Sequence, residues 1–515
     1  MSLPVYTYRA GLAALLSLAA LPATAQTVPD STAADERLLT AEQVRADLAV
    51  VRTALYESHA GLTWHIAPDD LARRVAAVEA GSGGPETVRA FHRRLLPLVA
   101  ALHHGHTALE LPTAGVGYRW RVLSRRRRYL PVEVRVSGGR VYVAADASAE
   151  GALGRGAEIV AVDGRPAAAL LDTMRAYLSA DGANDSFRMD ALGRAGQFPH
   201  LLDLIYGPAE AFALDVVPPG GGAPVRQTVA ALSPERTAEL YRERMGQAVD
   251  TFPPALRFEM LGPRAARITV FSFWSGLIPA GEPGFDAFFA DTFRRIREAG
   301  ATDVVLDLRG NGGGASLVAR DLYRYLADRP FGFAAGPATI ASTTMSTVPY
   351  ADGLSDGVRA FLAAPLDFAR QTPDGTWVLR DDAPGDGAPG DDAPQPDAFA
   401  GRLTVLTDGG SYSATTLLVD LIYRYHRRAG RDVWFAGEPP AGDLAGGRMS
   451  AGQTLTLVLP NSRQRLTVPL IGSAMHGAGY PGETRIPDAL LAPTGSDVAA
   501  GTDPVMAAVR ARLGL

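Results

Sequence analysis

The spacing of hydrophobic residues changes twice along the chain. From about Leu39 to Leu102 apolar residues recur every three or four positions, as in TAEQVRADLAVVRTALYESH (residues 40–59), which predicts amphipathic helices. Thr40 is expected to cap the first helix, and Gln43 stands where it would complete a capping box. We therefore expect a small N-terminal helical domain over residues 26–112.

From Tyr129 onward the apolar residues alternate with polar ones. YLPVEVRVSGGRVYVAAD predicts a strand, a Gly-Gly turn and a second strand. GALGRGAEIVAVDGRPAAALLDTM adds a short strand, an Asp-Gly turn and a helix. These segments predict a small β-rich module, which we place with its connecting strands over residues 113–262.

From Ala265 strands alternate with helices, which is typical of an α/β domain with a mainly parallel sheet. We assign residues 263–515 to this domain. Inside it, the Asp-, Gly- and Pro-rich segment near 371–396 has too few apolar residues for a core, so we expect a long exposed loop there.

Two segments of the α/β domain share one order of features. DVVLDLRGNGGGAS (residues 303–316) and LTVLTDGGSYSATT (residues 403–416) each give a strand, a glycine turn, small residues and a helix. The two helix N-termini, with their free N–H groups, could face one cleft. Ser413 would lie between strand and helix, where a nucleophilic hydroxyl can be exposed. The alternative is that Ser411 or Ser413 is simply an N-cap.

Composition removes several kinds of chemistry. The 515 residues are 47% hydrophobic and 20% charged, with a formal net charge of −5, so nothing favours nucleic-acid binding. The run RRRR at residues 125–128 is interpreted as solvated charge. Cysteine is absent, and all 50 basic residues are arginine, so thiol catalysis, disulfides, P-loops and Ser–Lys dyads are excluded.

The glycine turn at 310–315 also matches the dinucleotide fingerprint G-x-G-x-x-A. A nicotinamide or flavin dehydrogenase would need an acidic residue at the end of the next strand, about twenty positions further on. Asp328, the acidic residue at that distance, precedes the next strand instead. The context therefore disfavours a dinucleotide site, and no cofactor is expected.

The first 25 residues have the pattern of a signal peptide. Arg9 precedes the apolar stretch AGLAALLSLAAL (residues 10–21), and Ala23–Ala25 read ATA, an A-x-A cleavage site. We expect a mature protein that starts at Gln26 and is exported to the periplasm or beyond. Lipid attachment to cysteine is excluded, and no transmembrane segment is expected in the mature chain.

A serine nucleophile needs a base, and without lysine the natural candidate is one of the nine histidines. LHHGHTALEL concentrates three of them at the start of an expected strand, where His104 and His106 would share a face. They could form a metal pair, lie on the surface, or supply a general base. No matching ligand cluster is evident elsewhere in the sequence, so no metal site is expected.

Several of these motifs together resemble a known family. VVLDLRGNGGG, VLTDGGSYSATTLLVDLI, GYPGETRIPD and AALHHGHTAL are similar, in order, to segments of the tail-specific or C-terminal-processing serine peptidases, including their tricorn-like branch. The resemblance covers most of the mature chain. It implies an α/β core of ClpP/crotonase-like type, an N-terminal helical domain and a β-rich PDZ-like domain.

By position, the resemblance makes Ser413 the nucleophile and His106 its base. The oxyanion hole would consist of backbone N–H groups from Ala414 and from Gly312 or Gly313. Glu483, in GYPGETRIPD, is the candidate acid that orients the histidine.

Three positions depart from the family pattern. Glu438 stands where the processing peptidases have a catalytic lysine, Thr416 replaces an acidic residue, and Gly105 replaces a serine relay. The lysine dyad is therefore excluded, and the histidine route lacks two of its usual supports.

The expected activity is that of an exported serine endopeptidase that cleaves peptides or unfolded protein tails through an acyl-enzyme. The PDZ-like module would hold an extended peptide, such as a C-terminus, by strand addition. The alternative is a non-catalytic homologue that binds peptides or other ligands. The sequence leaves the oligomeric state open.

Overall fold

The computed structural model describes residues 34–515 apart from several short segments. These segments are 113–121, 152, 195, 247–251, 333–337, 355, 364, 381–391, 445–447, 451–452 and 475–485. The predicted signal peptide over residues 1–25 lies outside the described residues, and so does Glu483.

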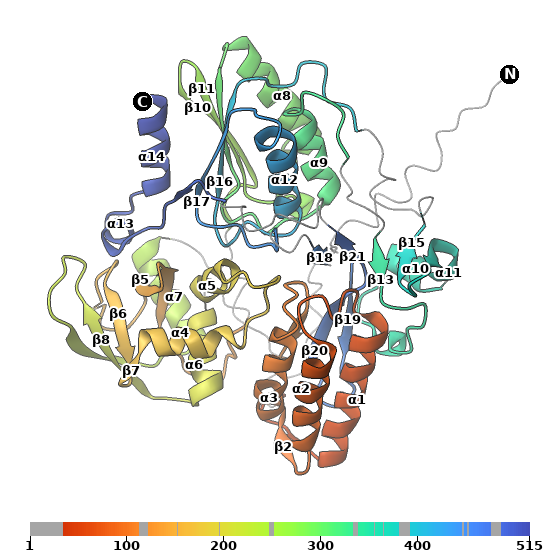
Figure 1. Ribbon diagram of the computed structural model, residues 1–515. Coiled ribbons are helices and arrows are strands. Elements are labelled where there is room, and N and C mark those ends of the chain that lie inside the picture. The colour runs from red at the N-terminus through yellow and green to blue at the C-terminus, as the bar shows by residue number, and fades with distance from the viewer. Residues whose placement is uncertain are drawn as a thin grey trace.

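A six-stranded sheet forms the centre of the α/β domain (Figure 1). Its strands are, in spatial order, β10 (Leu256–Gly262), β11 (Ala265–Val270), β12 (Asp303–Asp307), β16 (Arg402–Thr407), β17 (Val433–Gly437) and β22 (Ala489–Leu490). β10 is antiparallel to β11, and all the other pairs are parallel. The mainly parallel sheet of an α/β domain is therefore present where the strand–helix alternation predicts one.

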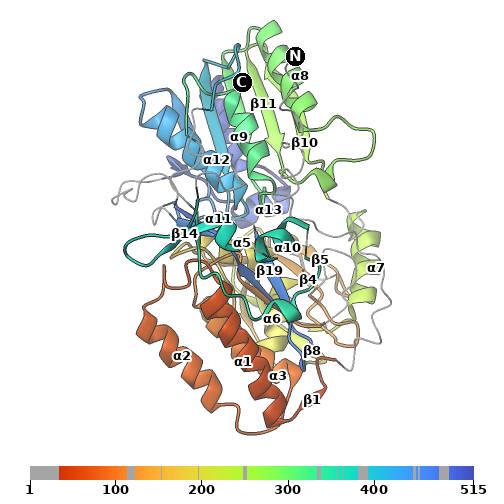
Figure 2. The ribbon, with the colours of Figure 1, turned by 90° about the vertical axis from the view of Figure 1, so that its right-hand side faces the viewer.

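Helices cover both faces of this sheet. Along β12, Val304 and Leu306 face the apolar cluster formed with α8 (Phe285–Glu298), α9 (Ser316–Arg324) and α12 (Ala414–Ile422). Val305 faces the other way and packs with α14 (Pro504–Leu513). Figures 1 and 2 show the three helices on one side of the strands and α14 on the other. Burial on both faces explains why these strands read as continuous apolar runs.

The predicted N-terminal helices are α1 (Ala41–Ser58), α2 (Pro68–Ala80) and α3 (Val88–Ala100). Thr40 and Gln43 form the expected capping box on α1. These helices pack on a three-stranded sheet of β19 (Thr454–Val458), β20 (Arg465–Pro469) and β3 (Ala108–Glu110). Figure 1 shows the blue strands β19 and β20 beside the orange helices, so a late part of the chain completes the core of the first helices.

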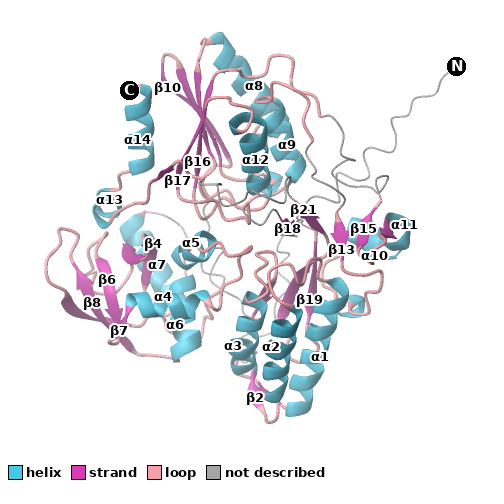
Figure 3. Cartoon of the chain, in the orientation of Figure 1, coloured by secondary structure: helices cyan, strands magenta, loops and turns pink. Residues whose placement is uncertain are grey.

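The β-rich module is an antiparallel sheet with helices against it (Figure 3). The sheet contains β4 (Val132–Ser137), β5 (Arg140–Asp146), β6 (Glu158–Val162), β8 (Ala211–Val217) and β9 (Val225–Ala230), and β7 (Arg165–Pro166) pairs with β6. The helices of this part are α4 (Ala167–Arg175), α5 (Ser186–Gly193), α6 (Gln197–Tyr206) and α7 (Pro234–Met245).

Part of the segment expected to be a long exposed loop is a β-hairpin. β14 (Ala369–Gln371) and β15 (Trp377–Leu379) pair, and Val378 is buried in the same apolar cluster as the N-terminal helices. The expectation of a segment without core residues is wrong here, because Trp377 and Val378 supply apolar surface between polar neighbours. Residues 381–391 lie outside the description.

The remaining described elements are short. They are β1 (Leu38–Leu39), β2 (Glu86–Thr87), β13 (Thr339–Ile340), β18 (Arg448–Ser450), β21 (Gly472–Ala474), α10 (Asp356–Ala363), α11 (Pro365–Phe368), α13 (Gly495–Ala500), η1 (Ser275–Leu277), η2 (Val348–Tyr350) and the π-helical turn η3 (Tyr423–Arg427). Within the part of the chain that the structure describes, no helix combines the length and the hydropathy that crossing a bilayer requires.

Candidate active site

The two glycine turns of the α/β domain lie against each other. They follow β12 and β16, which are parallel neighbours, so both turns emerge at the same edge of the sheet. Oδ1 of Asp408 accepts hydrogen bonds from the N–H groups of Gly310 at 2.8 Å and of Gly410 at 2.9 Å. A Cβ atom on Gly410 would stand 2.8 Å from the Cα of Gly310, so the contact requires glycine. One carboxylate thus joins the two turns.

Ser413 occupies the turn between β16 and α12 in a strained backbone conformation. Its φ of 58° and ψ of −120° are unusual for a residue with a side chain, and such strain is often found at functional sites. Ser413 stands at the N-cap position of α12, but its side chain makes no capping hydrogen bond. The alternative interpretation of Ser413 as a capping side chain is therefore wrong.

Ser411 has a different task. Its hydroxyl donates to the carbonyl of Leu308 at 2.9 Å and accepts from the N–H of Asp408 at 3.0 Å. Ser411 therefore ties the second turn to the end of β12, while the hydroxyl of Ser413 is left for another partner.

That partner is His106, whose Nε2 lies 3.1 Å from the Oγ of Ser413. The two residues are 307 positions apart in the chain. Desolvation by the surrounding protein lowers the pKa of His106 to about 4, so the imidazole is neutral near pH 7. A neutral histidine at hydrogen-bonding distance is able to accept the proton of a serine hydroxyl.

His106 lies in a turn and not on a strand. The strand β3 begins only at Ala108, and His103 has a φ of 55°. The expectation that His104 and His106 share a strand face is therefore wrong. Nε2 of His104 instead lies 2.8 Å from the carbonyl oxygen of Gly61.

The N–H groups expected to form an oxyanion hole differ in their partners. Gly313 donates to Oδ1 of Asn311 at 2.9 Å. Among the described residues, no protein acceptor is found for the N–H groups of Gly312 and Ala414. A Cβ atom on Gly313 would stand 2.7 Å from the Cβ of Ser413, so the glycine loop lies directly against the serine.

Asn311 and Arg309 hold this loop in place. Asn311 is fully buried, and its Nδ2 donates to the carbonyl of Val270 at 2.9 Å. The guanidinium of Arg309 forms ion pairs with Asp307 and with Asp503 at the start of α14. The glycine loop is therefore braced from the sheet and from the C-terminal helix.

His106 has two polar neighbours in addition to Ser413. The hydroxyl of Tyr412 lies 2.7 Å from Nδ1 of His106. Oδ1 of Asp181 accepts from the N–H of Gly105 at 2.7 Å, and the same carboxylate interacts with the Tyr412 hydroxyl. Tyr412 could have been suspected from its place beside Ser413, but no sequence signal points to Asp181.

The three departures from the family pattern have distinct surroundings. Glu438 forms an ion pair with Arg135 of β4. Thr416 is buried in α12, and its Oγ1 has no hydrogen-bond partner. Gly105 lies against the hydroxyl of Tyr412, 2.4 Å from where its Cβ would be. None of these positions adds a base to the site.

No group of three or more metal-ligating side chains comes together among the described residues. The histidines beside the site already have protein partners. Nε2 of His59, for example, lies 2.7 Å from the hydroxyl oxygen of Thr107.

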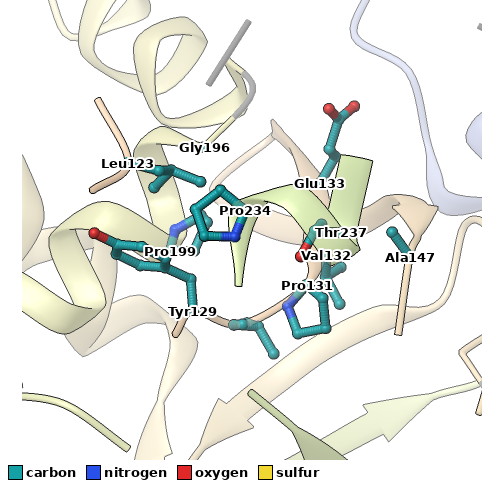
Figure 4. A pocket seen from close by; sticks show the side chains of 11 residues that line it. Leu123, Tyr129, Pro131, Val132, Glu133, Ala147, Gly196, Pro199, Pro234 and Thr237 are labelled. Carbon is teal, nitrogen blue, oxygen red and sulfur yellow. The ribbon is translucent and has the colours of Figure 1, made fainter. Parts of the chain in front are cut away.

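Two hollows in the described structure lie beside other residues. One, of about 540 Å³, is lined by Gly310 and Asp408 together with residues of β4, β5 and the C-terminal segment. The other holds only about 10 Å³ and lies in the β-rich module, where Figure 4 shows Leu123, Tyr129 and Pro234 around it. Neither is lined by Ser413 or His106.

A family model matches part of the chain. Residues 265–430 match the model of Peptidase family S41. The chain carries a peptidase family S41 domain. The matched segment includes both glycine turns and Ser413, whereas His106 lies outside it. The expected class, a serine-type peptidase related to the tail-specific proteases, is thereby confirmed at the level of the family.

Solved structures show how far the fold of this chain is shared. Mature CPAF complexed with lactacystin superposes with a TM-score of 0.59 at 14% identity, covering 92% of this chain and 97% of that chain. Mature CPAF alone gives a TM-score of 0.55 at 14% identity, covering 89% and 94%. These likenesses concern the fold, which is shared over nearly the whole length. A search of curated protein sequences found no significant match.

Proposed function

We propose that this S41 protein is an exported serine endopeptidase that cleaves peptides or unfolded protein tails through an acyl-enzyme formed on Ser413. The observation that carries the proposal is the 3.1 Å contact between the Oγ of Ser413 and Nε2 of a neutral His106. The strained backbone of Ser413 and its lack of a capping bond add support, because the hydroxyl is not used by the helix that follows it.

In the proposed reaction His106 removes the hydroxyl proton while Ser413 Oγ attacks the carbonyl carbon of a peptide bond. The oxyanion would be held by the N–H of Ala414, at the N-terminus of α12, and by the N–H of Gly312. His106 then gives its proton to the leaving amine. The amine departs, and the acyl group stays bound to Ser413 as an ester. Water, deprotonated by His106, hydrolyses the ester and restores the hydroxyl of Ser413. Glu483 stays our sequence-based candidate for an acid near the histidine.

For the fold we propose the finer assignment that the sequence suggests. The six-stranded sheet with α9 and α12 would correspond to a ClpP/crotonase-like core, and the sheet from β4 to β9 to a PDZ-like module. In that module β4 is an edge strand, but Gly193 of α5 lies against it, because a Cβ there would stand 3.4 Å from the carbonyl oxygen of Val134. Strand addition of a peptide to β4 would therefore displace α5.

The alternative function is a homologue that binds peptides without cleaving them. Labelling with a fluorophosphonate, which phosphonylates an activated serine, distinguishes the two. We expect labelling of the intact protein, complete loss in Ser413→Ala, and a fall of about 10²-fold or more in the labelling rate of His106→Gln, since general-base catalysis contributes about 10²–10⁴-fold. Ser275→Ala, at an exposed serine, is the matched control and should label normally.

Absence of labelling in the well-folded protein would favour the non-catalytic alternative. Labelling that survives in Ser413→Ala would contradict the assignment of the nucleophile.

A further inference from the structure

Both ring nitrogens of His106 have hydrogen-bonding neighbours. Nε2 lies 3.1 Å from Ser413 Oγ, and Nδ1 lies 2.7 Å from the hydroxyl oxygen of Tyr412. A neutral imidazole carries its single proton on one nitrogen only. Nε2 can accept the serine proton only if the ring proton is on Nδ1, so whatever holds a proton on Nδ1 decides whether the pair can react.

Tyr412 is held firmly in this position. Its ring is nearly buried and packs between His106, at a centroid distance of 4.8 Å, and Phe187, at 4.7 Å. Its backbone N–H donates to the carbonyl of Asn311 at 2.9 Å, so the tyrosine is fixed to the glycine loop as well. The same turn therefore places the serine and, one residue earlier, the hydroxyl that meets the far side of the histidine.

Gly105 makes room for this hydroxyl. A Cβ atom on residue 105 would stand 2.4 Å from the Tyr412 hydroxyl oxygen, which no side chain tolerates. The residue before His106 therefore has to be glycine if the tyrosine is to reach Nδ1.

Asp181 is the second polar neighbour of Gly105 and Tyr412. It is 1% exposed, and its Oδ1 accepts from the N–H of Gly105. The Tyr412 hydroxyl interacts with this carboxylate, and each group influences the pKa of the other. Oδ2 of Asp181 is buried and has no hydrogen-bond partner among the described residues, so it is available to accept the tyrosine proton.

The burial of these groups fixes their protonation. Desolvation raises the pKa of Tyr412 well above its usual value, so the phenol stays protonated and can donate. Desolvation also raises the pKa of Asp181 to about 7, with Gly105 and Tyr412 opposing the rise and Asp443 adding to it. At neutral and higher pH a substantial share of Asp181 is therefore ionised.

We propose that Tyr412 and Asp181 are positioning residues for His106, with Nδ1–H donating to the Tyr412 hydroxyl and that hydroxyl donating to the Asp181 carboxylate. This inference rests on the proposed function of Ser413 and His106. No proton travels along the relay. The proton of Ser413 moves to Nε2 and later to the leaving amine, while the relay holds the ring and stabilises the imidazolium.

Tyr412→Phe removes the hydroxyl and keeps the ring. We expect the rate constant for fluorophosphonate labelling of Ser413 to fall about 10²-fold or more, because groups that orient a functional histidine contribute at least 10–100-fold. Tyr323→Phe is the matched control, since Tyr323 is a buried tyrosine whose hydroxyl has no hydrogen-bond partner. It should label at the rate of the unchanged protein.

A second measurement does not depend on activity. The ¹⁵N NMR signals of His106, assigned by their loss in His106→Gln, report which ring nitrogen carries the proton. We expect the Nδ1–H form in the unchanged protein and an increase in the Nε2–H form in Tyr412→Phe. A residue that only packed against the ring would leave this ratio unchanged.

The outcomes separate the two proposals. If the unchanged protein is not labelled, the proposed function fails, while the NMR measurement still tests the relay. If it is labelled and Tyr412→Phe labels equally fast with the same tautomer, the relay is overturned. Asp181→Asn should slow labelling about 10-fold or more. If this variant labels at the full rate and Glu483→Gln loses labelling, the acid is Glu483 instead.

Discussion

The absence of a side chain at Gly105 allows the Tyr412 hydroxyl to lie next to His106. Ala at position 105 would bring a Cβ atom to 2.4 Å from the hydroxyl oxygen of Tyr412 and 2.8 Å from its Cζ. We therefore expect Gly105→Ala to push the tyrosine away from Nδ1, to lower the rate of fluorophosphonate labelling about 10-fold or more, and to lower the free energy of unfolding by about 1–3 kcal/mol, the range for overpacking. Labelling kinetics and urea unfolding measure the two effects.

Gly83 provides the control for this substitution. A Cβ atom there would meet nothing within 4 Å, so Gly83→Ala should leave both quantities nearly unchanged. Normal labelling of Gly105→Ala would contradict the close contact between Gly105 and Tyr412.

At the residue scale the sequence indicates only part of the site. Ser413 can be predicted because it lies between an apolar strand and a helix. His106 can be predicted because a lysine-free chain leaves histidine as the natural base. Asp181 cannot be predicted, because its contact with Tyr412 and Gly105 depends on how a segment of the β-rich module docks on the turn before β3. The placement of Glu483 stays a prediction.

At the scale of elements, the turn from β16 into α12 holds stored strain. Ser413 has a φ of 58° and a ψ of −120°, a conformation that glycine adopts at little cost and alanine does not. We expect the free energy of unfolding of Ser413→Gly, measured by urea unfolding, to exceed that of Ser413→Ala by about 1 kcal/mol. Both variants lack the hydroxyl. Glycine at a relaxed position in a helix or strand would instead be destabilising. Equal stability of the two variants would show that the turn relaxes.

Elements with a single, strong apolar pattern were predictable, and those with mixed signals were not. The strands β12, β16 and β17 and the helices between them follow from long apolar runs and amphipathic spacing. The segment 103–106 was expected at the start of a strand, but the φ of 55° at His103 and the bond from Thr107 N–H to the carbonyl of His104 make it a turn. Alternation over so few residues carries little information.

At the scale of the whole molecule, buried neutral histidines make stability depend on pH. His59 and His92 are 1% and 2% exposed, and burial lowers the pKa of each to about 4. The unfolded chain therefore binds more protons than the folded one between about pH 4 and 6.5, and the free energy of unfolding falls as the pH falls through that range. Asp181, with its raised pKa, acts in the opposite direction.

Urea unfolding at pH 7.5 and 5.0 measures this dependence. Each buried histidine should account for a fall of about 2 kcal/mol between these two values. His92→Gln, which keeps a side chain able to donate to Gln464, should reduce the fall. An identical pH dependence in this variant would contradict the buried, neutral state of His92.

Contacts between distant parts of the chain could not be predicted. Local periodicity alone predicts the helical domain over residues 26–112, yet its apolar core includes Leu457 and Leu466 of β19 and β20. Nothing in the alternation of those strands specifies their partner, because the pairing of β20 with β3 is set by packing across the molecule. The domain boundaries drawn from the sequence stay a prediction.

The pairing of β3 with β20 has a consequence for the time at which the protein can become active. β3 begins two residues after His106, and its Leu109 is opposite Leu466 of β20. A chain still on the ribosome has no partner for β3 until residues 465–469 have been made. If Ser413 and His106 act as proposed, the active site cannot assemble before residues 465–469 have been made, so no shorter nascent chain is an active peptidase.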